Sequence, residues 1–242
     1  MTKNLKRRVS RLLPALLALS FLAGCASQSF QAKEATNIKK IAVVKPLDPP
    51  FLLGANGDWA NNGGGLLGVL TAEGVKAANA GKDFNVKFNG DMKAQHLTLG
   101  ADLSSALQAD LQKLGYTVTV VSLAAARPGE LSTDYSSLKG QADAVLDLAI
   151  PSAGYAYRTW NPYEPAVMVR AQLTDLKTQR VLYSDIYSYA RRHNGGDTLL
   201  QPSSGYEFRS KDAVFKDPQR AANGIRSSVQ PIAAQISTAL KR

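Results

Sequence analysis

The chain has 242 residues, with 29 Lys and Arg against 19 Asp and Glu, so its formal net charge is +10. Apolar residues make up 45% and charged residues 20%, which is typical of a globular protein and argues against a wholly disordered chain. A single Cys excludes an internal disulfide framework and any metal site built from several Cys. Two His leave little material for a His-based zinc site or catalytic triad.

The first 24 residues have the parts of a secretory signal peptide. Residues 1–11 carry five basic residues and no acid, and an apolar run follows from Leu12 to Ala23. This run is shorter than the roughly 20 residues that cross a bilayer. It is also apolar on all sides, whereas an amphipathic surface helix would be striped. We therefore predict a leader over residues 1–24 that is removed on export.

The leader ends in Leu22-Ala23-Gly24-Cys25, which resembles a bacterial lipobox at all four positions. Such a site implies cleavage between Gly24 and Cys25, a diacylglyceryl thioether on Cys25, and a fatty acid such as palmitate on the new amino terminus. The alternative is an ordinary signal peptide with a spare Cys. Against it, the only Cys of the chain stands at the one position that the motif requires.

The residue after Cys25 and the remaining charge predict where the protein lies and what it contacts. Ala26 stands where an Asp is associated with retention in the inner membrane, so we expect an outer-membrane lipoprotein that faces the periplasm. Removal of residues 1–24 leaves a net charge of only +5 and no dense Lys/Arg patch interleaved with aromatics. We therefore expect the membrane as a partner, through the lipid, and no nucleic acid. The covalent lipid on Cys25 is the only non-protein group expected.

The mature chain is predicted to be one periplasmic α/β domain, residues 38–242, on a polar tether formed by residues 25–37. A buried strand over Ile41–Val44 ends at Pro46. From Pro46 to Gly68, Pro and Gly interrupt every regular pattern, and we predict a loop-rich insertion over residues 46–90. Within it we expect a short helix over residues 66–80 and a peripheral strand over residues 84–88.

Clearer elements follow the insertion. Leucines at 99, 103, 107, 111 and 114 form one stripe of a helix, which Gly115 ends in the left-handed conformation. Strands are expected over residues 116–121 and 142–150, with a short helix over 132–140 between them and Pro151 ending the second strand. Residues 154–160 and 166–175 are predicted strands, and residues 180–190 return as a hairpin.

The carboxyl-terminal part is predicted to be a loop over residues 191–216 and then a helix. Asp217 caps that helix and Pro218 occupies its first turn. A core stripe continues through Ile225, Val229, Ile232, Ile236 and Leu240, and Pro231 should kink the helix or split it. The predicted fold class is therefore α/β, with helices packed on a mixed β-sheet.

The strand over Ile41–Val44, the helix that feeds Tyr116–Val121, the strand that begins near Ala142 and the hairpin from Val167 to Leu182 resemble a bacterial periplasmic module. This module is the N-terminal-domain fold of the Tol translocation protein TolB, shared with the curli secretion lipoprotein CsgG and with small lipoproteins of exopolysaccharide export. The resemblance covers about two thirds of the mature chain. It implies an outer-membrane-anchored lipoprotein, often ring-forming, that binds or assembles partners. Gln179 stands where the hairpin turn of the module has Gly, and the segment 46–90 has no counterpart there.

Aromatic residues supply the remaining candidate contact site. They form two groups along the sequence. Successive side chains of a strand point to opposite faces, so Tyr183, Tyr187 and Tyr189, which are separated by even numbers of residues, share one strand face. Such a face suits contact with a protein partner or a sugar. The alternative is that it is a half-buried sheet face under a helix. The candidate contact residues are Tyr155, Tyr157, Trp160, Tyr183, Tyr187 and Tyr189.

No catalytic or metal-binding residue is singled out. Gly63–Gly68 formally matches G-x-G-x-x-G, but a dinucleotide site needs a strand immediately before it, and the predicted strand ends well upstream. No G-x-S-x-G motif is present. We therefore expect a lipid-anchored envelope protein with a structural, assembly or partner-binding role, acting with envelope proteins or by self-association. The alternatives are a periplasmic lipoprotein that binds a glycan or small ligand and, from a third class, an envelope hydrolase.

Overall fold

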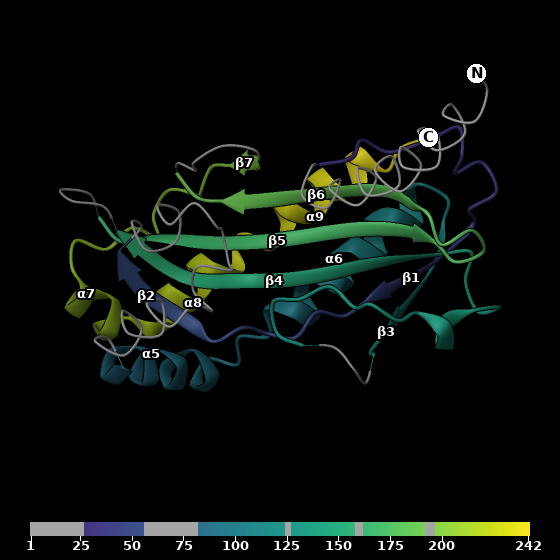
Figure 1. The fold of residues 1–242 in the computed structure, drawn as a ribbon. Helices are drawn as coiled ribbons and strands as arrows, with labels where there is room; N and C mark the ends of the chain where they lie inside the picture. The colour runs from purple at the N-terminus through teal and green to yellow at the C-terminus, as the bar shows by residue number, and fades with distance from the viewer. Residues whose placement is uncertain (1–26, 56–81, 124–126, 158–161, 192–196) are drawn as a thin grey trace, which may run out of the picture.

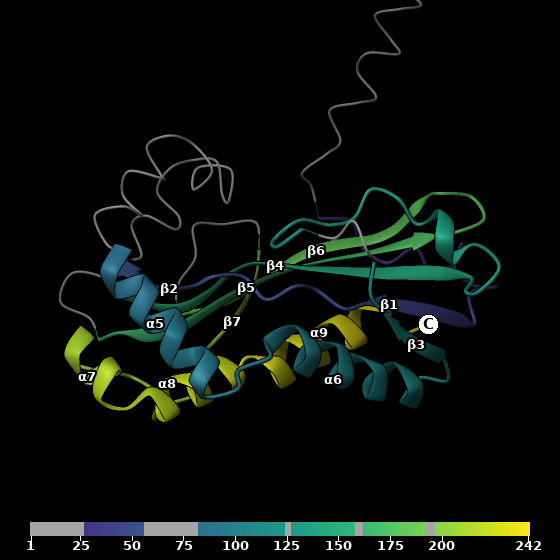
Figure 2. The same cartoon turned by 90° about the horizontal axis from the view of Figure 1, so that it is seen from below.

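The computed structural model describes residues 27–55, 82–123, 127–157, 162–191 and 197–242, and all statements below concern these ranges. In them, one mixed sheet is covered on one face by helices, as Figures 1 and 2 show from two directions. The α/β class with helices packed on a mixed sheet is therefore confirmed. None of the described helices has the length and hydropathy needed to cross a membrane.

Seven strands form the described sheet, with β4 at its centre. The order is β3-β1-β4-β5-β6-β7, and β2 pairs with β4 on the same side as β1. β1 is parallel to β3 and β4, β2 is parallel to β4, and β4, β5 and β6 form an antiparallel meander. The strands are β1 (Lys40–Val44), β2 (Phe51–Ala55), β3 (Thr117–Val121), β4 (Ala144–Tyr157), β5 (Glu164–Asp175), β6 (Val181–Tyr189) and β7 (Thr198–Leu200).

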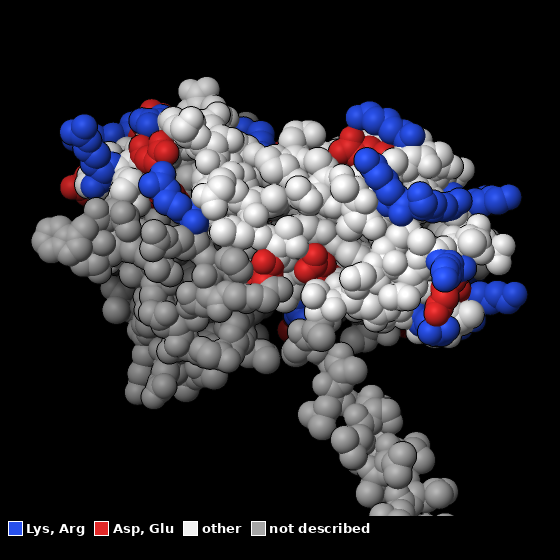
Figure 3. Space-filling model, turned by 90° about the horizontal axis from the view of Figure 1, so that it is seen from above, with Lys and Arg blue, Asp and Glu red and all other residues white. Residues whose placement is uncertain are grey.

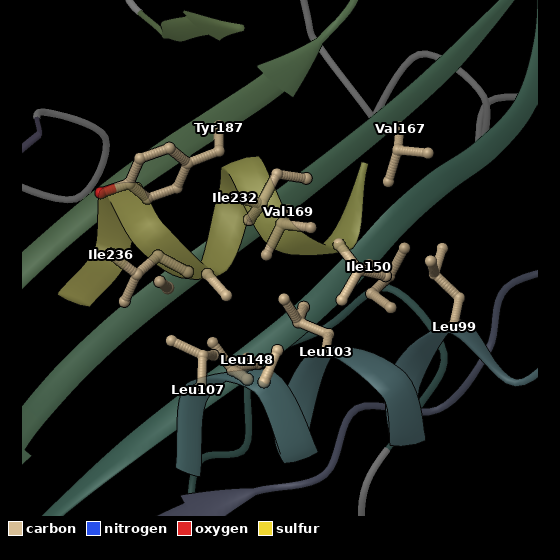
Figure 4. Packing of buried hydrophobic residues seen from close by; sticks show 14 of the residues in the cluster. Leu99, Leu103, Leu107, Leu148, Ile150, Val167, Val169, Tyr187, Ile232 and Ile236 are labelled. Carbon is tan, nitrogen blue, oxygen red and sulfur yellow. The ribbon is translucent and has the colours of Figure 1, made fainter. Parts of the chain in front are cut away.

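The main core lies between the sheet and its helices. Leu99, Leu103 and Leu107 of one helix and Ile232 and Ile236 of another point at buried side chains of β4, β5 and β6 (Figure 4). Burying each large aliphatic side chain contributes about 1.5–3 kcal/mol, so this layer is the main source of stability. The helices are α5 (Lys82–Ala94), α6 (Leu99–Lys113), α7 (Lys211–Lys216), α8 (Pro218–Arg226) and α9 (Val229–Ala239), with a single 3₁₀ turn over Ser136–Leu138.

Most of the elements predicted after residue 98 are confirmed. The leucine stripe is α6, and Gly115 behind it has φ +87°. The Asp217 carboxylate accepts a hydrogen bond from the Arg220 N–H at 3.1 Å, and Pro218 is the first residue of α8. The predicted split is also present, because α8 ends at Arg226 and α9 begins at Val229. Pro231 lacks the N–H that would bond the carbonyl of residue 227, so the interruption falls there.

Strand β4 does not end at Pro151 as predicted but continues to Tyr157. The pairing of β4 with β5 shifts register between Ala149 and Ser152. This irregularity accommodates a proline, which cannot donate a hydrogen bond to the ladder. The predicted break between residues 150 and 154 is therefore wrong, and one long strand replaces two short ones.

Two further predictions about loops are wrong. Residues 51–55, inside the stretch 46–68 expected to have no regular pattern, form β2, and residues 191–216, expected to be a loop, contain β7 and α7. Residues 84–88 are helical, although Phe84, Val86 and Phe88 alternate with polar residues. The side chain of Phe88 is buried while Val86 is 71% exposed, so the buried positions follow a spacing of four that continues to Met92. Residues 56–81, with the predicted helix over 66–80, lie outside the described residues.

The outer edge of β2 is covered by side-chain amides of α5. The Phe51 N–H donates to Asn89 Oδ1 at 2.7 Å, and Asn89 Nδ2 donates back to the Phe51 carbonyl at 2.8 Å. The Leu53 N–H donates to Asn85 Oδ1 at 2.9 Å. Asn is a weak helix former, so helix propensity does not explain why α5 has Asn at both 85 and 89. Their hydrogen bonds to β2 do. They close an edge that would otherwise accept a foreign strand.

The β5–β6 hairpin turns through Gln179, which has φ +60°. The Asp175 carboxylate accepts the N–H groups of Lys177 and Thr178, and the Gln179 N–H donates to the Asp175 carbonyl at 2.8 Å. The turn thus requires a left-handed residue at position 179, and Gln carries a steric cost of about 1–2 kcal/mol there.

We predict that Gln179→Gly stabilises the protein. Glycine adopts a positive φ without strain, but it loses entropy on folding, so the net gain in the free energy of unfolding should be about 0.5–1 kcal/mol. Urea unfolding measures it. Gln179→Ala is the matched control, because it removes the same side chain and keeps the strain. Equal stability of the Gly and Ala variants would contradict this account of the turn.

We also predict that Asn89→Ala destabilises the protein by about 1–3 kcal/mol, because it leaves both backbone groups of Phe51 unpaired. Asn89→Asp should fall between the Ala variant and the wild type, since it keeps the acceptor and loses the donor. Hydrogen exchange at Phe51 and urea unfolding report the change. Lys93→Ala on the exposed side of α5 is the control, and an Asn89→Ala variant as stable as this control would disprove the edge-closing role.

Candidate functional site

The lipidation and cleavage residues, Gly24 and Cys25, lie outside the described residues. The segment that follows them is described from Ser27 and contacts β6. Gln28 forms a two-way bridge with Ser184 of β6, with N···O distances of 2.7 and 3.0 Å. The Gln28 side-chain amide donates to the Val181 carbonyl at 2.8 Å, and the Gln31 N–H donates to the Leu182 carbonyl at 2.9 Å. The amino-terminal segment is therefore hydrogen-bonded to the outer edge of β6.

Further contacts hold the same segment farther along the chain. Ala35 and Ile38 are buried in the main core. Arg180, beside the hairpin turn, forms an ion pair with Glu34 at 2.9 Å. Residues 28–38 are thus part of the folded domain, and the stretch expected to be a tether over residues 25–37 is much shorter. Between Cys25 and the first pinned residue, Gln28, only Ala26 and Ser27 remain.

Four of the six candidate aromatic contact residues lie inside the molecule. Tyr155, Tyr183, Tyr187 and Tyr189 are buried in the core under the helices. Tyr157 is half-buried and its ring lies 4.8 Å from that of Tyr163, and Trp160 lies outside the described residues. The shared face of Tyr183, Tyr187 and Tyr189 is confirmed by the register of β6 on β5. For these three and for Tyr155, the structure favours the interpretation of a covered sheet face over that of a partner surface.

The hydroxyls of the β6 tyrosines are bonded to the protein. Those of Tyr183 and Tyr187 form a hydrogen bond with each other, and burial raises the pKa of Tyr187 to about 12. The Tyr189 hydroxyl accepts the Ser203 N–H at 2.6 Å and lies 2.9 Å from Ser227 Oγ in the turn between α8 and α9. Through the Tyr189 hydroxyl, β6 is joined to the segments that cover this face of the sheet.

Tyr155 is packed differently, beneath helix α8. Its ring meets Phe88 and Phe208 edge-on, with centroids 6.3 and 5.4 Å away. A Cβ on Gly224 of α8 would collide with the Tyr155 hydroxyl, so only glycine lets the helix approach this closely. Burial raises the pKa of Tyr155, and its hydroxyl has no hydrogen-bond partner among the described residues. The side chain acts as a core residue on which α5 and α8 rest.

Among the described residues, Asp147 is the one buried Asp or Glu, and it lies on the opposite face of the sheet. It is 1% exposed on β4, and its Oδ2 accepts the Ser132 N–H at 2.5 Å and the Tyr135 hydroxyl at 2.8 Å. Burial raises the pKa of Asp147, and the two hydrogen bonds oppose this rise without cancelling it. Together with the apolar contacts of Leu138 and Val145, these bonds hold the segment before β4 against the sheet. No signal in the sequence distinguishes Asp147 from the other acids near strands.

Metal binding and nucleotide binding find no support in the described ranges. There, no three His, Cys, Asp and Glu side chains gather closely enough to hold a metal ion. His96 is exposed at the end of α5, and His193 lies outside the described residues. The glycine-rich Gly63–Gly68 also lies outside them.

Comparison with known proteins gives matches to solved structures alone: no family model matches the chain, and no curated protein does. Lipoprotein GNA1162 of Neisseria meningitidis is 18% identical with a TM-score of 0.30, over 65% of this chain and 88% of that one. A putative neuraminyllactose-binding hemagglutinin homolog of Helicobacter pylori is 11% identical with a TM-score of 0.35, over 85% and 84%. A PelC dodecamer of Paraburkholderia phytofirmans is 14% identical with a TM-score of 0.29, over 85% and 96%.

These structural matches thus include a bacterial lipoprotein. In the absence of a family match, the resemblance to the TolB and CsgG module stays a prediction. We therefore base the functional proposal on this chain's own residues.

We predict that Asp147→Asn changes the pH dependence of stability with a defined sign. The folded chain keeps the Asp147 proton to higher pH than the unfolded chain, whose carboxyl titrates near pH 4. Wild-type stability therefore falls, through this group, as pH rises from about 4 to the folded-state pKa. The variant should gain stability relative to the wild type across that window and then stay level. Urea unfolding over a pH series measures this difference.

Asp134→Asn is the control of opposite sign. The Ser136 N–H donates to the Asp134 carboxylate and lowers its pKa, so removing the charge should cost stability above pH 4. A difference between the Asp147→Asn variant and the wild type that does not change with pH would contradict the assignment.

Proposed function

We propose that this chain is a lipid-anchored envelope lipoprotein that faces the periplasm from the outer membrane and has a structural, assembly or partner-binding role. One observation carries the proposal: the only Cys of the chain is the last residue of Leu22-Ala23-Gly24-Cys25, directly after a basic and apolar leader. One acyl chain anchors a protein only marginally, whereas the three that such a site receives make the anchor permanent.

A role without catalysis is supported by how the domain uses its chemical groups. The buried carboxylate Asp147 and the buried hydroxyl of Tyr189 each bond to backbone or side-chain groups that hold covering segments in place. Burial also raises the pKa of Tyr187 to about 12, which keeps this hydroxyl protonated near neutral pH, and it raises the pKa of Asp147. These are the properties of structural polar groups.

For the partners, we propose envelope proteins or further copies of this chain. Within the described part of the sheet, β3 is the terminal strand, and its exposed Thr117 and Thr119 lie on the side away from the core. A terminal strand offers backbone groups to which a strand of another chain can add. On the same side of β4, the Asn85 and Asn89 amides of α5 close the outer edge of β2, so addition there is blocked.

We predict that Cys25 carries the lipid in living cells. A fatty-acid probe should label the wild-type chain, the intact mass should match a chain that begins at acylated Cys25, and the protein should fractionate with the outer membrane. Cys25→Ser should abolish the label and leave the leader attached, because the thiol is the acceptor for the diacylglyceryl group. The measurements are in-gel detection of the probe and mass spectrometry of the purified chain.

The matched control moves the thiol by two residues. Cys25→Ser combined with Ser27→Cys keeps one thiol near the same place but outside the motif, and it should not be labelled. An unlabelled wild-type chain with its leader intact would refute the proposal, and labelling of the displaced thiol would refute the assignment of the motif.

A further inference from the structure

The amino-terminal segment fixes how close the lipid lies to the domain. Gln28 is pinned to Ser184 by two backbone hydrogen bonds, and Cys25 is three residues away. Three residues span at most about 11 Å even when fully extended. A lipid on Cys25 therefore enters the membrane close to the outer edge of β6, and no flexible linker lets the domain turn away from it.

The sheet is wide enough that its two edges, at β6 and at β3, lie at different distances from the lipid. From β6 to β3 there are four strand spacings of about 4.8 Å, or roughly 19 Å. The edge at β3 thus lies beyond the reach of the linker, whereas the edge at β6 is within it. Since the glyceryl group of the lipid must lie at the level of the headgroups, the short linker holds the β6 edge near the bilayer and places no such restriction on the β3 edge.

Basic side chains accompany the segment that comes nearest the membrane. Lys33 is exposed in the docked segment, and Lys177 and Arg180 are exposed in the hairpin turn that leads into β6. Figure 3 views the molecule from above Figure 1, where β6 and β7 lie, and shows Lys and Arg gathered at both ends of this face, with acidic residues among them and two acidic patches in the middle. Exposed lysines close to the bilayer, such as Lys33 and Lys177, attract anionic lipid headgroups at about 1 kcal/mol per basic residue.

We propose that the outer edge of β6, together with Lys33 and Lys177, forms the membrane-facing surface of the domain and contacts anionic phospholipid headgroups of the bilayer that holds the anchor. The inference rests on the proposed lipid anchor. It adds an orientation: the edge of the sheet at β3 faces away from the membrane and is left accessible to partners.

Lysine footprinting tests this orientation on the natural side chains. The purified lipidated chain is placed in detergent, in phosphatidylcholine vesicles, and in phosphatidylcholine–phosphatidylglycerol vesicles, and the rate of acetylation of each Lys is measured by mass spectrometry. Lys33 and Lys177 should react several-fold more slowly in the anionic vesicles than in detergent. Lys113, which is 74% exposed at the end of α6 next to β3, should react at the same rate in all three.

Two further arms make the test decisive. A Gly-Ser insertion of ten residues between Ala26 and Ser27 adds a linker with an end-to-end distance of about 17 Å, so the protection of Lys33 and Lys177 should fall. Equal protection of Lys113, or protection that survives the insertion unchanged, would overturn the orientation. Equal protection in neutral and anionic vesicles would overturn the contact with anionic headgroups.

A chemically anchored sample separates this inference from the proposed function. The chain that begins at Cys25 is coupled through its thiol to a maleimide phospholipid, which reproduces the geometry whether or not cells acylate that residue. If the natural chain carries no lipid but the coupled chain shows the predicted protection, the proposed function fails and the orientation holds. If the natural chain is acylated and neither sample shows protection, the orientation fails and the anchor stands.

Discussion

Strand β4 is the element on which the other layers depend. It runs from Ala144 to Tyr157 and pairs with β1 and β2 on one side and with β5 on the other. Its side chains alternate between the two faces, so Leu146 and Leu148 lie in the main core while Val145 and Asp147 lie under the segment before the strand. A shift of β4 by one residue would move Leu146 and Leu148 out of the main core and turn the Asp147 carboxyl into it, and this fixes the register of the sheet.

Polar side chains complete this arrangement at the places where backbone hydrogen bonding stops. Asp147 binds the covering segment, Asn89 satisfies the free edge of β2, and the Asp143 carboxylate accepts the N–H groups of Lys39 and Lys40 where β1 begins. Each of these contacts joins parts of the chain that are distant in sequence. An unpaired buried polar group costs about 1–3 kcal/mol, so these residues specify which segment covers which edge.

The sequence predicts the elements whose pattern is local. The leucine stripe of α6, the glycine behind it and the Asp-Pro start of α8 each depend on residues within one or two turns, and all three are confirmed. The errors arise where tertiary structure overrides a local rule. Pro151 ends a strand in a local view, but the register shift on β5 accommodates it. Phe84, Val86 and Phe88 fit a strand as well as a helix, and only the packing of Phe88 and Met92 distinguishes them.

Among the candidate site residues, too, local patterns predict some features, while others depend on tertiary packing. The motif at Cys25 can be found from adjacent residues alone, whereas burial of Tyr155, Tyr183, Tyr187 and Tyr189 depends on where α8 and α9 pack. A period of two shows that β6 tyrosines share a face, but it does not show whether a helix of the same chain covers that face. The pairing of Gln28 with Ser184 is likewise hidden, because 156 residues separate the partners and a polar stretch after a lipidation motif has the composition of a linker.

This pairing has a mechanical consequence for a lipid-anchored domain. A long flexible tether absorbs displacement between lipid and protein, but two residues absorb almost none. Any force on the anchor therefore reaches the hydrogen bonds of Gln28 and Gln31 on β6 and the ion pair of Glu34 with Arg180. Those contacts lie on the outer strands, and β5 separates them from β4. Force on the anchor can therefore break the contacts of residues 28–34 with β6 and the hairpin turn before the central strand β4 and its two buried faces are disturbed.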